Sequence, residues 1–222
     1  MFWIRSREVV RAGYEHRPVR TTLQLVREAE TRLDEAPPEV LPELFSGKAQ
    51  TLALAGRDVE AEQALCQVRK CFGKLPTPLI HSDSLSTFDW GEERLRFPES
   101  FVYSHMADFA KAEKAQQAAL SLYPDSNMRS PAQIELLRAL RLVRSGDRAQ
   151  GTRHAQTTIT DLPVMHRIRP IADLGQRVLS VIPAHERQQS WAQEYRECLE
   201  CLECLESSFP GQASSLITTA RA

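Results

Sequence analysis

Three stretches of the chain, residues 54–61, 105–112 and 144–151, share one pattern of small residues around a short polar turn. In each stretch a Gly or Ala marks the turn, another small residue lies seven positions before it, and a third lies five positions after it. These trios are Ala49, Gly56 and Ala61, then Ser100, Ala107 and Ala112, then Ala139, Gly146 and Gly151. Two antiparallel helices approach closely only where their side chains are small, so each trio predicts a tight helical hairpin. A hairpin of this size cannot bury its own apolar face, and it stacks on copies of itself into an array with a concave surface.

Apolar residues at helical spacing extend the pattern beyond the three turns. A helix is predicted over 19–36, where a Pro-Pro pair then stops it. The further predicted helices pair as 41–55 with 58–72, 98–105 with 109–123, 132–144 with 148–162 and, more weakly, 171–181 with 186–205. Pro124 and Pro163 each lie seventeen residues past the preceding turn, which is typical of a repeat.

We therefore expect an all-α protein, a right-handed superhelical stack of about five helix-turn-helix hairpins that spans residues 1–206. Residues 207–222 are expected to form a flexible C-terminal tail. The stretch 77–92 interrupts the repeat with Pro, Ser and Gly among apolar residues, and two interpretations of it stay open. It is an ordered loop packed on the array or a lid over the groove.

Composition excludes some classes of partner. The chain has 28 Lys and Arg residues against 29 Asp and Glu residues, so no overall field attracts nucleic acid or an anionic membrane. Its 222 residues are 42% hydrophobic and 26% charged, as in one folded domain. The N-terminal residues lack the apolar run of a signal peptide, and no window is apolar enough to span a bilayer. We expect a cytoplasmic protein whose five cysteines are reduced thiols.

The repeated trios, the bulky residues Leu52, Tyr103 and Leu142 in the first helices, and the closing prolines resemble the tetratricopeptide repeat. This repeat is a helix-turn-helix unit of about 34 residues. The resemblance covers residues 40–165 best, although the turns are spaced irregularly along the chain. It implies a solenoid in which the first helix of each hairpin lines the concave groove.

A narrower resemblance involves residues 88–105, 118–124 and 140–147. They are similar to the C-terminal repeat region of actinobacterial helix-turn-helix transcriptional regulators, in which a repeat array follows a small DNA-binding domain. Nothing before Val19 has room for such a domain, so the chain is a free-standing repeat protein or a piece of a regulator. The resemblance implies a sensing or partner-binding role in regulation and lends no DNA-binding residue to this sequence.

The candidate binding residues are the outward positions of the predicted first helices. They are Gln50, Leu54, Phe97, Phe101, His105, Gln133, Leu136, Leu140 and Arg144. Phe97, Phe101 and His105 recur at four-residue spacing and are expected to form one exposed aromatic face.

The leading hypothesis is a module that binds a protein or peptide in the groove, with Arg144 contacting a carboxylate. One alternative is a small-molecule sensor with a pocket under the 77–92 loop, lined by Phe101, His105, Leu136 and Leu140. Another is a structural array that dimerises through its terminal hairpin.

No motif for catalysis is present: the chain has no P-loop, no dinucleotide-type glycine motif, no G-x-S-x-G and no H-E-x-x-H. We expect no enzyme activity and no cofactor. Cys198, Cys201 and Cys204 follow C-x-x-C-x-x-C spacing, but residues three apart on a helix fan over a wide arc and match a tetrahedral metal site poorly. These thiols are predicted to line the inner side of a terminal helix and to bind no metal.

Overall fold

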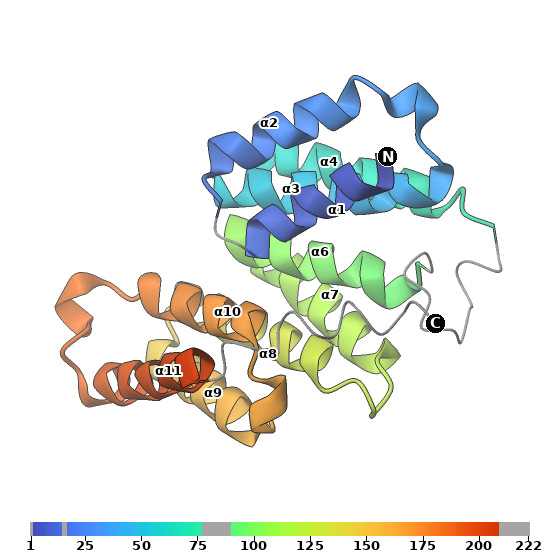
Figure 1. Cartoon of the computed structure of the whole chain (residues 1–222). Coiled ribbons are helices and arrows are strands. Elements are labelled where there is room, and N and C mark those ends of the chain that lie inside the picture. Colours follow the sequence, from blue (N-terminus) through green and yellow to red (C-terminus); the bar gives the residue numbers. More distant parts are fainter. Residues whose placement is uncertain (1, 15–16, 77–89, 209–222) are drawn as a thin grey trace.

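The computed structural model describes residues 2–14, 17–76 and 90–208 (Figure 1). Within these ranges the protein is all-helical, with ten α-helices, four short 3-10 helices and no strand, as the sequence predicts. The α-helices are α1 (Phe2–Tyr14), α2 (Val19–Glu30), α3 (Leu41–Leu54), α4 (Asp58–Phe72), α6 (Glu92–Met106), α7 (Phe109–Leu122), α8 (Arg129–Ser145), α9 (Arg148–Asp161), α10 (Arg169–Ser180) and α11 (Ser190–Ser208). The 3-10 helices are η1 (Leu33–Glu35), η2 (Pro38–Val40), η3 (Val164–His166) and η4 (Ala184–Glu186).

The α-helices pack as consecutive pairs, α1 with α2, α3 with α4, α6 with α7, α8 with α9, and α10 with α11. We call the earlier member of each pair the first helix and the later member the second helix. First helices of neighbouring pairs also pack on one another, from α1 through α3, α6 and α8 to α10. In addition α1 contacts α10, so the row of first helices curves until its two ends meet. In Figure 1 the pairs follow one another from blue at the N-terminal end to orange and red at the C-terminal end.

The three predicted turns share one backbone geometry. Their central residues have positive φ angles, 68° at Gly56, 60° at Ala107 and 108° at Gly146. In each turn the N–H of the following residue donates to the carbonyl oxygen five positions earlier, at 3.0 to 3.1 Å: Arg57 to Leu52, Asp108 to Tyr103, and Asp147 to Leu142. This left-handed closure satisfies carbonyls that the end of a helix leaves unpaired and turns the chain back on itself.

The predicted helix crossings are confirmed as well. All six small residues that flank the turns are buried. A Cβ atom added at Gly151 would lie 2.9 Å from the carbonyl oxygen of Ala139 and 2.6 Å from Val143 Cγ2, so a side chain does not fit there. The backbones of α8 and α9 are therefore in direct contact where the sequence places two small residues.

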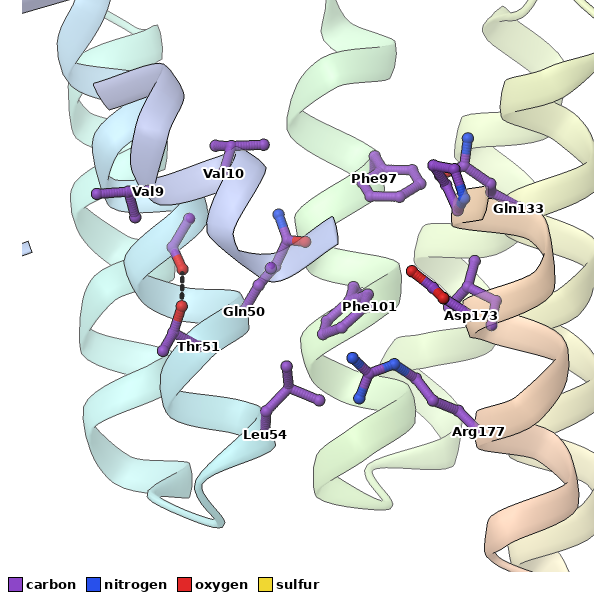
Figure 2. Close-up of a pocket in the computed structure, with 14 residues that line it drawn as sticks. Val9, Val10, Gln50, Thr51, Leu54, Phe97, Phe101, Gln133, Asp173 and Arg177 are labelled. Atoms are coloured by element: carbon purple, nitrogen blue, oxygen red, sulfur yellow. Dashed lines mark hydrogen bonds between the residues drawn. The ribbon is translucent and has the colours of Figure 1, made fainter. Parts of the chain in front are cut away.

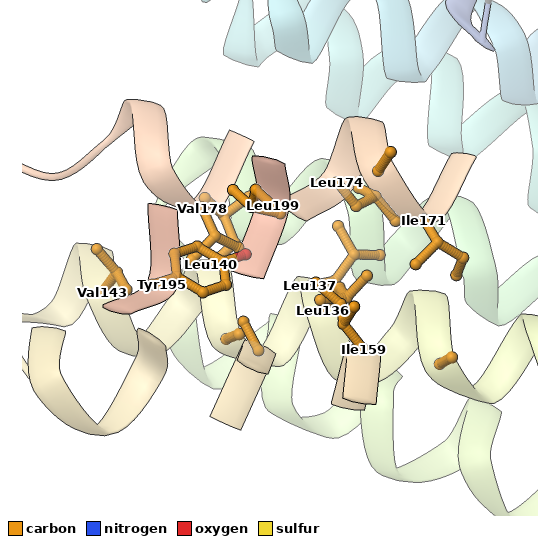
Figure 3. Packing of buried hydrophobic residues seen from close by; sticks show 14 of the residues in the cluster. Leu136, Leu137, Leu140, Val143, Ile159, Ile171, Leu174, Val178, Tyr195 and Leu199 are labelled. Atoms are coloured by element: carbon orange, nitrogen blue, oxygen red, sulfur yellow. The ribbon is translucent and has the colours of Figure 1, made fainter. Parts of the chain in front are cut away.

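The largest core cluster joins α8 and α9 to the last pair (Figure 3). Leu136, Leu137 and Leu140 of α8 meet Ile171 of α10 and Tyr195 of α11 in this cluster. The Tyr195 hydroxyl is fully buried and donates to the carbonyl oxygen of Gly175 at 2.9 Å. The last pair is thus held on α8 by a continuous apolar interface.

Some helix limits differ from the predictions. α6 begins at Glu92, six residues before the predicted start at Pro98, and runs through the proline. Proline is favoured in the first turn of a helix, but here the burial of Leu95 and Pro98 favours a longer helix that begins before it. α2 ends at Glu30 rather than at residue 36, and η1 takes up the remainder.

At the C-terminal end α11 extends to Ser208, so the first two residues of the predicted tail are helical. Residues 209–222, and the part of the predicted loop at 77–89, lie outside the described residues. Within 2–14, 17–76 and 90–208, no helix combines the length and the apolar character that crossing a bilayer requires.

Candidate ligand-binding pocket

One pocket lies between the first helices of all five pairs (Figure 2). Its walls come from α1, α3, α6, α8 and α10, and it encloses about 510 Å³ of empty space with its mouth included. The lining residues are Val9, Val10, Gly13, Gly47, Gln50, Thr51, Leu54, Phe97, Phe101, Gln133, Pro170, Asp173, Leu174 and Arg177. We refer to it as the central pocket.

A glycine on α3 lets α1 form the first wall. A Cβ atom added at Gly47 would lie 2.8 Å from Val9 Cγ1 and 3.2 Å from Val10 Cγ2. α1 therefore packs directly on the backbone of α3, which places Val9 and Val10 at the pocket. The Thr51 hydroxyl, one turn further along α3, donates back to the carbonyl oxygen of Gly47 at 2.7 Å, so this polar group is satisfied within the wall.

The apolar surface opposite α1 is provided by α6. Phe97 and Phe101 both line the pocket, but Phe101 is only 7% exposed, so the expected exposed aromatic face is instead a pocket wall. The ring of His105 stacks on Phe101 with centroids 4.2 Å apart. Its Nδ1–H donates to the carbonyl oxygen of Phe101 at 2.7 Å.

The position of His105 determines its charge. Burial is the main cause that holds its pKa down at about 4, and the nearby cations Arg177 and Arg144 act in the same direction. His105 is therefore neutral at pH 7 and supports Phe101 from behind the pocket wall.

Besides Thr51, four polar side chains line the pocket: Gln50, Gln133, Asp173 and Arg177. The Gln50 amide donates to Ser46 Oγ at 3.1 Å. The Oε1 atom of Gln133 is buried and accepts no hydrogen bond from any described residue. In Figure 2 the guanidinium of Arg177 extends from α10 towards Leu54 and Phe101.

Arg177 is a cation in a mostly apolar setting. Burial lowers its pKa, and the carboxylate of Asp173, one helical turn away, acts in the opposite direction. Within the part of the chain that the structure describes, the guanidinium makes no hydrogen bond and no ion pair.

The structure brings five of the nine predicted binding residues together. Gln50, Leu54, Phe97, Phe101 and Gln133 all line the central pocket. They come from three different first helices, α3, α6 and α8, as the resemblance to a helical repeat implies.

The other four predicted residues do not line it. Leu136 and Leu140 are 0% and 1% exposed, so the prediction that they point outward is wrong. The last pair packs over this side of α8 and makes both leucines part of the core. Arg144 is exposed near the end of α8, and His105 lies behind Phe101.

Two walls of the pocket were not predicted. On α10, Ile171, Leu174 and Val178 recur at helical spacing and face the core, so the neighbouring Asp173 and Arg177 were candidates for a lining face. On α1, the apolar residues Val9 and Ala12 stand three positions apart, a helical spacing that could have indicated a buried face. The structure buries both side chains.

The cysteine run is only partly on the inner side of α11. Leu199 and Leu202 are buried and Cys198 is half-buried, but Cys201 is exposed, contrary to the prediction. The side chain of Cys204 lies outside the described residues. Among the side chains that the structure describes, no three His, Cys, Asp or Glu residues gather closely enough to hold a metal ion.

Compared with known proteins, the chain matches no family model, no curated protein and no solved structure. The resemblances to the tetratricopeptide repeat and to regulator repeat regions stay predictions.

Proposed function

We propose that this chain is a non-catalytic binding module and that its ligand site is the central pocket. The observation that carries the proposal is the convergence of all five first helices on one mostly apolar cavity with a few polar groups in its walls. Pockets that bind small molecules have this composition, with apolar walls for affinity and a few polar groups that orient the ligand.

Enclosure favours a small ligand over a long peptide. An extended peptide needs an open groove along the first helices, whereas here α1 contacts α10 and brings the ends of the row together. Small-molecule sensing therefore ranks above peptide binding for this pocket. The site differs from the sensor pocket predicted from the sequence, because its walls are α1, α3 and α10 in addition to α6 and α8.

A tetratricopeptide-like solenoid is the architecture that we infer for the module. Three features support it: the pairwise order of contacts, the positive φ angle shared by the three turns, and the small residues at the crossings. In such arrays function resides on the concave side, where the first helices lie. A sensing role in regulation is compatible with this arrangement.

Gly13 offers a direct test of the site. It lines the pocket, and a Cβ atom added there meets no atom within 4 Å, so a side chain at this position fills the pocket without displacing a helix. Gly13→Leu also replaces a glycine in a helix by a better helix former, and it is expected to preserve or raise the melting temperature.

The probe is N-phenyl-1-naphthylamine, an uncharged dye that fluoresces in apolar surroundings. The wild-type chain is expected to bind one dye molecule. Gly13→Leu is expected to weaken dye binding roughly tenfold or more, because the leucine side chain occupies the apolar space that the dye would fill. Val59→Leu is the control, because Val59 is 73% exposed on α4 and outside the pocket. Equal dye binding by wild type and Gly13→Leu would show that the dye, and the proposed site, lie elsewhere.

A further inference from the structure

We propose that the ligand of the central pocket is a small amphipathic carboxylic acid, with its carboxylate on Arg177 and its apolar part against Phe97 and Phe101. This assignment of a ligand class rests on the proposed function, since it assumes that the central pocket is the binding site.

The guanidinium of Arg177 is the group in the pocket that most constrains the ligand. It projects into the pocket (Figure 2) and has no hydrogen bond or ion pair to any described residue. The side chain of Arg177 is partly buried, so its charge is only partly hydrated. A guanidinium presents paired N–H donors that match a carboxylate. A bound carboxylate would supply the partner that the described part of the protein does not.

The charges around Arg177 leave room for an anion. Arg144 on α8 adds positive charge, and His105 on α6 is neutral at pH 7. Asp173 on α10 is the opposing charge, but Figure 2 shows its carboxylate on the Phe97 side and the guanidinium on the Leu54 side. The end of the pocket near Leu54 is therefore positive.

The remaining walls define the rest of the ligand. The apolar lining includes Val10, Phe97, Phe101 and Leu174, which favour an aliphatic or aromatic body. At the other end Gln133 Oε1 is buried without a hydrogen bond from a described residue, so it would accept one from a ligand hydroxyl or N–H group. The best-fitting ligand thus has an acid at one end and a hydrogen-bond donor at the other.

A free small acid fits better than the carboxylate end of a peptide. The remainder of a peptide would have to leave the pocket, whereas the contact between α1 and α10 closes the row of first helices around it.

The experiment measures displacement of N-phenyl-1-naphthylamine by two matched probes, 3-phenylpropionate and 3-phenylpropan-1-ol. The wild-type chain is expected to prefer the acid roughly tenfold or more, the usual gain from a hydrogen-bonded charge. Arg177→Met keeps an apolar stem and is expected to bind both probes within about twofold, each displacement being referred to that variant's own dye affinity. Arg153→Met, which alters an exposed arginine on α9, is the control and should behave as wild type.

Three outcomes would overturn the assignment while the dye still reports the pocket. They are equal displacement by acid and alcohol, no displacement by either, or a preference for acid that persists in Arg177→Met. Stronger displacement by acetyl-Gly-Gly-Phe than by 3-phenylpropionate would also overturn it, because the pocket would then bind peptide ends. Dye binding that Gly13→Leu leaves unchanged contradicts the proposed function itself, so the two failures are distinguishable.

Discussion

The three central pairs and the two terminal pairs of this protein are built in different ways. In the central pairs, a left-handed residue and two small residues fix each hairpin within thirteen residues of sequence. The last pair has no such turn: η4 connects α10 to α11, and a large apolar core holds the pair on α8. The terminal pairs nevertheless supply α1 and α10, which complete the central pocket. The repeated hairpins provide the frame, and the atypical ends provide much of the site.

A second repeated device surrounds α10. The Arg167 side chain donates to the carbonyl oxygens of Leu162 and Thr160 at 2.7 and 2.8 Å, just before α10 begins. Twenty residues later, Arg187 donates in the same way to Ile182 and Ser180, at 3.0 and 3.2 Å. Arg167 thus satisfies carbonyls at the end of α9, and Arg187 satisfies carbonyls at the end of α10, so both helices end on an arginine side chain rather than on a left-handed turn.

The largest expected effect tests whether His105 is buried behind the pocket wall. His105 has a pKa of about 4 in the folded chain, against about 6.5 in an unfolded chain. Its neutral form therefore stabilises the fold fully above pH 6.5, and this contribution is lost as the pH falls from 6.5 to about 4. The loss amounts to about 3 kcal/mol.

Urea unfolding between pH 7 and pH 4 measures this loss. His105→Gln is expected to flatten the pH dependence, whereas His185→Gln, at an exposed histidine, should not. If an NMR titration gives His105 an ordinary pKa, then this end of α6 is exposed to solvent and the row of first helices is open there.

The next prediction concerns the central pairs. Ala112 is 0% exposed at the crossing of α6 and α7, and Ala112→Leu is expected to destabilise the fold by about 1–3 kcal/mol through overpacking. Ala110→Leu places the same side chain at an exposed position of the same helix and should change little. Melting temperatures of the two variants that agree within error would show that small residues are not required at the crossing.

These central hairpins are also where prediction from sequence succeeded. The conformations of Gly56, Ala107 and Gly146 depend on residues within one turn of each, so the sequence pattern was sufficient. Leu136 and Leu140 were assigned to the wrong side because their burial depends on α10 and α11, which are distant in sequence. The pocket walls on α1 and α10 were missed for the same reason, since they are brought together by contacts between the two ends of the chain.

The smallest of these effects tests the arginine caps. Arg167→Met removes two hydrogen bonds to helix-end carbonyls and is expected to cost about 1–2 kcal/mol. Arg187→Met should cost less, because Arg187 is exposed where Arg167 is half-buried. Amide hydrogen exchange is the readout: exchange at the C-terminal end of α9 should rise in Arg167→Met while α3 and α4 stay unchanged. Uniform acceleration along the chain would contradict a local role.

The central claim is that first helices from both the central and the terminal pairs form one binding site. Hydrogen–deuterium exchange with and without saturating N-phenyl-1-naphthylamine tests it most directly. The account predicts that the dye slows exchange in α1, α3, α6 and α10 together and leaves the second helices α4 and α7 unchanged. Protection confined to one pair, or protection of the second helices alone, would contradict it.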